Sequence, residues 1–184
     1  MEKRFKTGKL KQRPKIVAIT GAESTGKSTL SEQLSQHFEI PFEPEFARDY
    51  VRKIGNKYTF SDVEFIARKQ VKQYEELAQS DHKLVILDTW LLITKVWFDV
   101  VFQKVPDWIE EGIQKLPIDL FLVCDTDLPW MPDDVRENGG ENRLKLHTRY
   151  LNEIKSYGFQ YHIVSGTGAE RTQNAISCLN GLLE

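Results

Sequence analysis

Nine residues near the start of the chain, Gly21 to Thr29 (GAESTGKST), combine glycines, hydroxyls and a lysine at a spacing that suits phosphate binding. Gly21-x-x-x-x-Gly26-Lys27-Ser28 fits the P-loop pattern, between an apolar run and a segment of helical period. Glycines let backbone N–H groups face a phosphate, and the next helix adds unpaired donors and partial positive charge. A plain strand–turn–helix junction is the alternative, but it does not need the lysine.

These residues predict a site for ATP and Mg²⁺. Lys27 is expected to bridge the β- and γ-phosphates, and Ser28 to offer its hydroxyl to Mg²⁺. Glu23 is expected to point outward, because a carboxylate facing phosphates would repel them. The other predicted ATP contacts in the loop are Gly21, Ser24, Thr25, Gly26 and Thr29.

Asp88 follows the apolar run KLVIL (83–87) and matches a Walker-B aspartate at the carboxyl edge of a parallel sheet. We predict that it holds Mg²⁺; capping the next helix is the alternative role, and both can coexist. A guanine-reading Asn-Lys-x-Asp motif is lacking, since the one Asn-Lys pair, Asn56-Lys57, is followed by Tyr-Thr. The sequence therefore favours a small-molecule kinase or an ATP-driven switch over a GTPase.

The stretch EPEFARDY (43–50) follows a weak second strand, where kinases with a parallel sheet keep acceptor contacts. Glu45 or Asp88 is expected to take the acceptor's hydroxyl proton, and Arg48 to contact the acceptor. Helix capping and solvation are the alternative for these charges. Trp97 is our candidate for stacking on a planar ring, with Trp90 and Trp130 as further possibilities, although core packing is the commoner fate of tryptophan.

The polar stretch 125–142 is the one long loop, and we predict a mobile lid. Arg136 and Arg143 would neutralise charge during phosphoryl transfer, with Gly139-Gly140 as the hinge. Two solvated surface arginines are the alternative.

Short apolar runs, at 15–20, 83–87, 119–123 and 160–164 with a weaker one at 40–42, predict about five strands. Segments of helical period separate them; Ser61 and Glu64 predict a capping box, and 91–102 a buried helix. Alternating strands and helices predict an α/β fold of three layers around a parallel sheet, of the P-loop nucleoside-kinase type.

The 184 residues suit one domain over 14–184, preceded by a flexible leader at 1–13. The formal charge of −2 gives no field for nucleic acid or a membrane surface, and no apolar run reaches the roughly 20 residues of a membrane span. Cys124 and Cys178 lack disulfide or metal spacing, so we expect reduced cysteines and a cytoplasmic protein.

The ordered set GAESTGKSTL, EFARDY, LDTW, TKVW, DLPWMPDDVRENGG and VSGTGAER resembles the ribosylnicotinamide kinase domain of the NadR family, from about Lys15 to the C-terminus. The resemblance implies transfer of the ATP γ-phosphate to the 5′-hydroxyl of nicotinamide riboside. It also implies an adenine pocket shaped by Gly166, Thr167 and Gly168, with Arg171 nearby; a turn without a ligand is the alternative.

The chain departs from that family in three ways. Only a short stretch precedes the P-loop strand, and no His-x-Gly-His motif occurs, so we expect neither adenylyl transfer nor repressor activity. Trp90 stands where the family often has a second acid, two residues after the Walker-B-like aspartate. A kinase of another nucleoside and a nucleotide-responsive binding module therefore stay open as alternatives.

Overall fold

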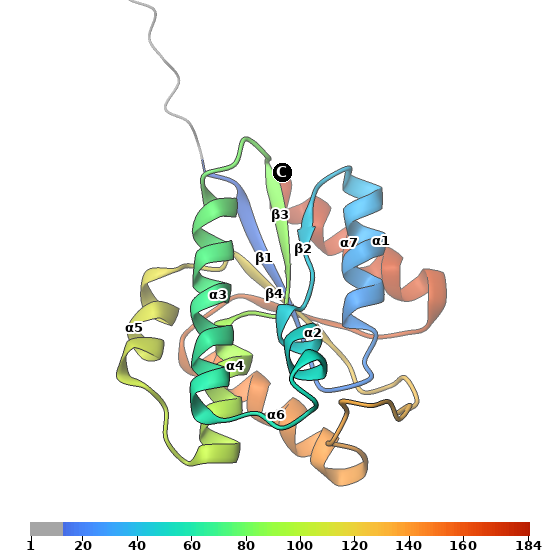
Figure 1. The fold of residues 1–184 in the computed structure, drawn as a ribbon. Coiled ribbons are helices and arrows are strands. Elements are labelled where there is room, and N and C mark those ends of the chain that lie inside the picture. The colour runs from blue at the N-terminus through green and yellow to red at the C-terminus, as the bar shows by residue number, and fades with distance from the viewer. Residues whose placement is uncertain (1–12) are drawn as a thin grey trace, which may run out of the picture.

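Five parallel strands form the central sheet of the computed structural model, which describes residues 13–184 (Figure 1). Their order across the sheet is β2-β3-β1-β4-β5. The strands are β1 (Lys15–Thr20), β2 (Phe42–Glu43), β3 (Leu84–Asp88), β4 (Leu120–Cys124) and β5 (Tyr161–Val164). The α/β class and the five strands are confirmed. Most of the predicted leader lies outside the described residues.

Helices connect the strands, and the chain alternates strand and helix for most of its length. They are α1 (Lys27–Phe38), α2 (Phe46–Lys53), α3 (Phe60–Ala78), α4 (Leu91–Trp97), the π-helix η1 (Phe98–Phe102), α5 (Asp107–Lys115), α6 (Gly140–Ser156) and α7 (Gly168–Leu183). In the described part of the chain, no helix is long and apolar enough to cross a membrane.

Helices cover both faces of the sheet (Figure 1). Its strands alternate side chains between these faces, so the sheet separates two apolar layers. Val17 and Ile19 of β1 face α1 and α7, whose Leu34 and Leu179 are fully buried. Ile16 and Ala18 face the other side, where α3, α4, α5 and α6 pack. Three layers result, as predicted, and the carboxyl ends of β1, β3 and β4 meet at one edge.

Two local expectations need correction. The capping box of α3 is formed by Thr59 and Asp62, not Ser61 and Glu64, because the helix already begins at Phe60. The run 91–102 is not one regular helix, since α4 passes into η1 after Trp97. The cysteines agree with prediction: Cys124 and Cys178 are both free thiols.

At the opposite edge of the sheet, Asp119 secures the entry to β1. Its carboxylate accepts a hydrogen bond from the buried backbone N–H of Ile16 at 2.8 Å and from Arg13 Nη1 at 2.7 Å. Burial opposes the charged form, but the Arg13 and Ile16 hydrogen bonds outweigh it, so the pKa of Asp119 is lowered.

We expect Asp119→Asn to lower the free energy of unfolding by about 1–2 kcal/mol at pH 7, because a charged acceptor of a buried N–H is lost. A carboxyl whose folded pKa is lowered stabilises the protein above its unfolded pKa and loses that contribution as pH falls. The difference from wild type should therefore shrink below about pH 4. Urea unfolding between pH 3 and 7 measures it, with Glu75→Gln on the exposed face of α3 as control; a difference independent of pH would contradict the charge argument.

Candidate active site

The loop between β1 and α1 has the backbone that phosphate binding requires. Gly21 has φ 141°, and a Cβ there would lie 2.7 Å from the carbonyl oxygen of Cys124. Gly26 has φ 76° and is the N-cap of α1, so Lys27 begins the helix. Glycine is needed at both positions, since other side chains rarely adopt these conformations. The N–H groups of the first helical turn therefore lie beside the loop.

Inside the loop, Lys27 Nζ and Thr25 Oγ1 each donate to the Ala22 carbonyl oxygen at 2.9 Å. The Thr25 side chain is buried, so its hydroxyl stabilises the loop instead of facing phosphates as we expected. Ser28 and Thr29 stay exposed at the start of α1.

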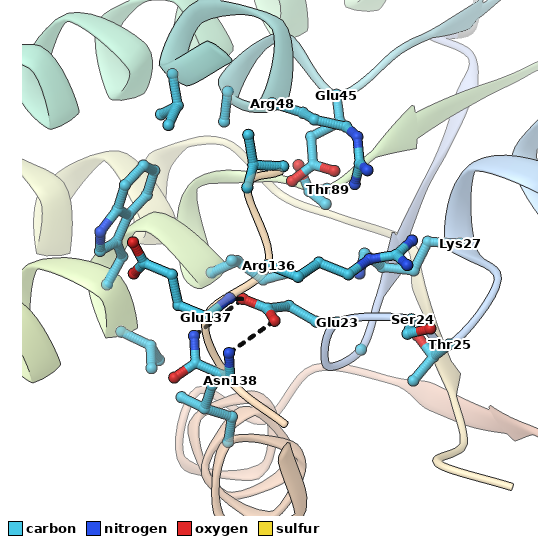
Figure 2. Close-up of a pocket in the computed structure, with 18 of the residues that line it drawn as sticks. Glu23, Ser24, Thr25, Lys27, Glu45, Arg48, Thr89, Arg136, Glu137 and Asn138 are labelled. Carbon is cyan, nitrogen blue, oxygen red and sulfur yellow. Dashed lines mark hydrogen bonds between the residues drawn. The ribbon is translucent and has the colours of Figure 1, made fainter. Parts of the chain in front are cut away.

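A cavity of about 290 Å³ joins this loop to the predicted acceptor residues (Figure 2). The predicted loop residues Gly21, Ser24, Thr25, Gly26, Lys27, Ser28 and Thr29 line one end. The rest is lined by Glu45 and Arg48, by Tyr58 and Trp97, and by a band of aliphatic side chains that includes Val96, Val100 and Val101. A phosphate-sized polar region and an aromatic region thus share one space.

Glu45 is free to act in that cavity. It is the N-cap residue of α2, but its side chain makes no capping hydrogen bond, so the capping alternative does not hold. Burial raises its pKa, with Asp88 adding to the increase, while Lys27 and Arg48 oppose it. A carboxyl with a raised pKa and cations nearby is typical of an acid–base group.

Asp88 ends β3 and is 3% exposed. Neither of its oxygens accepts a hydrogen bond of normal geometry, although Ser28 is close enough for its hydroxyl to favour the charged form. Burial is the larger effect and raises the pKa of Asp88. Trp90, not Asp88, is the N-cap of α4, so the capping role is excluded.

Asp88 lines a small adjoining cavity, and Thr89 lines both cavities. Thr89 has φ 68°, which a β-branched residue rarely adopts, and its N–H donates to the Ile19 carbonyl at 3.0 Å. The backbone is therefore held under strain directly after the predicted metal ligand, as is common at functional sites.

The loop from Asp125 to Gly139 lies against the P-loop and α2. It is three residues shorter than the predicted lid of 125–142, because α6 begins at Gly140. Glu23 does not point outward, contrary to expectation. Its carboxylate accepts hydrogen bonds from the backbone N–H of Glu137 and from the backbone and side-chain N–H of Asn138 (Figure 2). Neutral N–H donors of the lid thus stabilise the carboxylate of Glu23, which we expected to point away from the phosphates.

Arg136 and Arg48 both line the cavity and share one carboxylate. Asp133 pairs with Arg48 from α2 and, at 3.2 Å, with Nε of Arg136 from the lid. The Arg136 side chain runs across the cavity toward the P-loop end (Figure 2). The ion pairs of Asp133 therefore connect the lid to the predicted acceptor side of the site.

Arg143 and Arg171 do not line the cavity. Arg143 is 6% exposed and donates to the carbonyl oxygens of Glu23, Ser24 and Leu128. Arg171 is 5% exposed and donates to Thr25 O and to the Asp127 carboxylate. In this structure both guanidinium groups are used to hold the outer side of the P-loop, which corrects the expectation that Arg143 faces the transferred phosphate.

Of the remaining residues predicted to contact ATP or the acceptor, some line the cavity and others lie outside it. Trp97 lines the cavity and meets Tyr58 edge to face at 4.8 Å. Trp90 is 1% exposed in the core, and Trp130 packs against Gly139. Thr167 and Gly168 stand at the exposed start of α7, outside the cavity.

No cluster of three His, Cys, Asp or Glu side chains able to hold a metal occurs among residues 13–184.

Sequence reasoning missed Tyr58, Asp133 and Asn138. Asp133 and Asn138 lie in the PDDVREN stretch of the lid, where the carboxylate and amide beside Arg136 were the available signal. Tyr58 comes from the loop between α2 and α3 and reaches the site only through tertiary packing, so no local pattern marked it.

Comparisons with known proteins agree with this geometry. The family model described as "AAA domain" matches residues 16–171. The trifunctional NAD biosynthesis/regulator protein NadR of Salmonella typhimurium is 26% identical over 144 residues, which is 76% of this chain and 35% of that protein. The chain thus spans about a third of the length of this curated relative.

Two solved structures share the fold. A NadR protein in complex with NR has a TM-score of 0.76 and 21% identity, covering 93% of this chain and 52% of that one. The deoxyadenosine kinase of M. mycoides has a TM-score of 0.65 and 16% identity, covering 91% and 99%. The fold is therefore that of P-loop nucleoside kinases, and the family match over most of the chain shows that this protein belongs to the AAA domain family and is homologous to NadR.

Proposed function

We propose that this protein is an ATP-dependent kinase that phosphorylates nicotinamide riboside at its 5′-hydroxyl to give nicotinamide mononucleotide. The observation that carries the proposal is the single cavity in which Lys27 and the P-loop stand at one end and Glu45, Tyr58 and Trp97 line the rest. Its volume of about 290 Å³ suits a nucleoside. The homology to NadR and the fold shared with a NadR protein in complex with NR support this acceptor.

In this proposal the P-loop N–H groups and Lys27 bind the ATP phosphates, and Tyr58 and Trp97 bind the planar cationic ring of the acceptor. The acceptor oxygen attacks the γ-phosphorus, the bond from that phosphorus to the β–γ bridging oxygen breaks, and ADP leaves. The hydroxyl proton goes to Glu45, which lines the cavity, or to Asp88, which lines the small cavity that adjoins it. Arg48 and Arg136 stabilise the charge on the transferred group. Catalysis is mainly positioning and electrostatic stabilisation.

The residues present fit a bound Mg²⁺. Asp88 has two buried oxygens without a hydrogen-bond donor, close to the exposed hydroxyl-bearing Ser28. Carboxylate and hydroxyl oxygens are ligands that Mg²⁺ prefers, together with phosphates and water. We propose Asp88 and Ser28 as its protein contacts. When bound, the ion supplies positive charge against the phosphates.

The proposal is tested by measuring ADP release with a panel of nucleosides that includes nicotinamide riboside, deoxyadenosine and cytidine. Nicotinamide riboside should stimulate ADP release most, and Lys27→Ala should lower the rate by about a hundredfold or more, because the phosphate charge loses its partner. Circular dichroism should show an intact fold in the variant. Strong stimulation by another nucleoside would identify that nucleoside as the acceptor in place of nicotinamide riboside. Tight ATP binding without any acceptor-dependent turnover would indicate a nucleotide-responsive module instead.

We expect Asp88→Asn to raise the Mg²⁺ concentration for half-maximal activity by about tenfold or more, because a neutral amide is a weaker ligand. Titrating Mg²⁺ at saturating ATP measures the change, and Glu45→Gln is the matched control that removes a nearby charge outside the proposed metal contacts. An unchanged Mg²⁺ requirement in Asp88→Asn, with a lower maximal rate, would assign Asp88 to proton transfer alone.

Glu45 as the base predicts a specific pH dependence. A base works deprotonated, and burial raises the pKa of Glu45, so kcat/KM should fall as pH drops through a value above the ordinary glutamate pKa of about 4.3. In Glu45→Gln that acid limb should disappear and the rate at pH 7.5 should fall by about a hundredfold or more. Rates between pH 4.5 and 8.5 check this; a limb that persists in the variant would identify Asp88, whose pKa is also raised, as the base.

A further inference from the structure

The lid backbone leading to Arg136 is held by Asp133. One oxygen of that carboxylate accepts the backbone N–H groups of Val135 and Arg136, at 2.9 and 3.0 Å. The other oxygen pairs with Nε of Arg136 at 3.2 Å and with Arg48. Asp133 therefore holds the backbone of Arg136 and, together with the Met131 carbonyl oxygen that accepts from Arg136 Nη1, its guanidinium group.

The lid backbone following Arg136 is held by Glu23 of the P-loop. The N–H groups of Glu137 and Asn138 donate to its two oxygens at 3.3 and 2.8 Å, and the Asn138 side chain donates at 2.9 Å. Four consecutive backbone N–H groups, 135–138, are thus bound by two carboxylates, one on each side of Arg136.

This arrangement acts on the one lid arginine side chain that lines the cavity. An arginine on a free loop has many rotamers, and ordering it during the reaction would cost free energy. Hydrogen bonds to the backbone of Arg136 and of its two neighbours order this segment before the reaction begins, which removes much of that cost. Because Glu23 belongs to the P-loop, the ordered backbone is attached directly to the phosphate site.

We propose that Glu23 and Asp133 are positioning residues that hold Arg136 in place over the P-loop for phosphoryl transfer. The step for which Arg136 is positioned rests on the function proposed above. The fixed lid backbone is a property of the fold and can be measured without turnover.

The kinetic test compares Asp133→Asn with Asp134→Asn. Asparagine at 133 keeps an oxygen for the two N–H groups but loses the ion pairs, so kcat should fall about 10- to 100-fold, more than KM for the acceptor rises. Asp134 is the matched control, since it also connects the lid to α2, through Arg52 at 2.7 Å, yet neither residue lines the cavity. Asp134→Asn should stay within about twofold of wild type, because an exposed ion pair contributes little.

A double variant separates positioning from simple loss of charge. If Asp133 acts through Arg136, Asp133→Asn should cost kcat much less in an Arg136→Ala background than in wild type. Full additivity, or an equal loss in Asp134→Asn, would overturn the role of Asp133.

Hydrogen exchange tests the Glu23 contacts without any turnover. In Glu23→Gln an amide NH₂ group replaces one of the two acceptor oxygens, so exchange at Glu137 or at Asn138 should be about tenfold faster or more. Glu141→Gln is the control, because it removes an equal charge from the exposed first turn of α6. Asp133→Ala should accelerate exchange at Val135 and Arg136.

Unchanged exchange in Glu23→Gln and Asp133→Ala would overturn the inference, as would faster exchange with wild-type kcat. If the wild-type protein phosphorylates no acceptor, the proposed function fails, and the exchange rates alone then decide whether the two carboxylates hold the lid backbone.

Discussion

The structure depends on one constraint: a loop that turns its N–H groups toward a phosphate must turn its carbonyl oxygens the other way. Those oxygens then need donors, because buried polar groups without partners are costly. Arg143 and Arg171 supply them, since their buried guanidinium groups donate to the carbonyls of Glu23, Ser24 and Thr25. Two arginines from separate helices therefore support the phosphate-binding loop from behind.

The same support explains how the lid is built. Arg143 also donates to Leu128, and Arg171 also pairs with Asp127, so each guanidinium group connects the P-loop to the segment after β4. The lid is consequently attached to the P-loop at its beginning by arginines and near its end by Glu23. A loop held at both ends can order the residues between them, which is where Arg136 lies.

Features that depend on residues close together in the sequence were predictable, and features that depend on residues far apart in the sequence were not. The five strands and the P-loop were predictable, because strand periodicity and the Gly21–Ser28 spacing are local patterns. The direction of the Glu23 side chain and the carbonyl oxygens that accept from Arg143 Nε and Nη2 were not predictable, since these contacts join residues more than 100 positions apart in the chain. For the same reason Arg136 and Arg143 seemed equivalent in sequence, although one lines the cavity and the other is buried behind the P-loop.

Trp90 stands where the resembling family often has an acid. It does not line the larger cavity, but it affects the surroundings of Asp88. Its indole is buried among Tyr74, Phe121 and Phe159 and borders the small cavity beside Asp88. Trp90 and Asp88 line the same small cavity, so an aromatic ring stands there in place of an acid that would repel Asp88. Apolar surroundings raise the free energy of the charged carboxylate, consistent with burial as the main cause of the raised pKa of Asp88. A cation placed against Asp88 would favour the charged form, so the Mg²⁺ contact proposed for Asp88 would be coupled to the deprotonation of its carboxyl group.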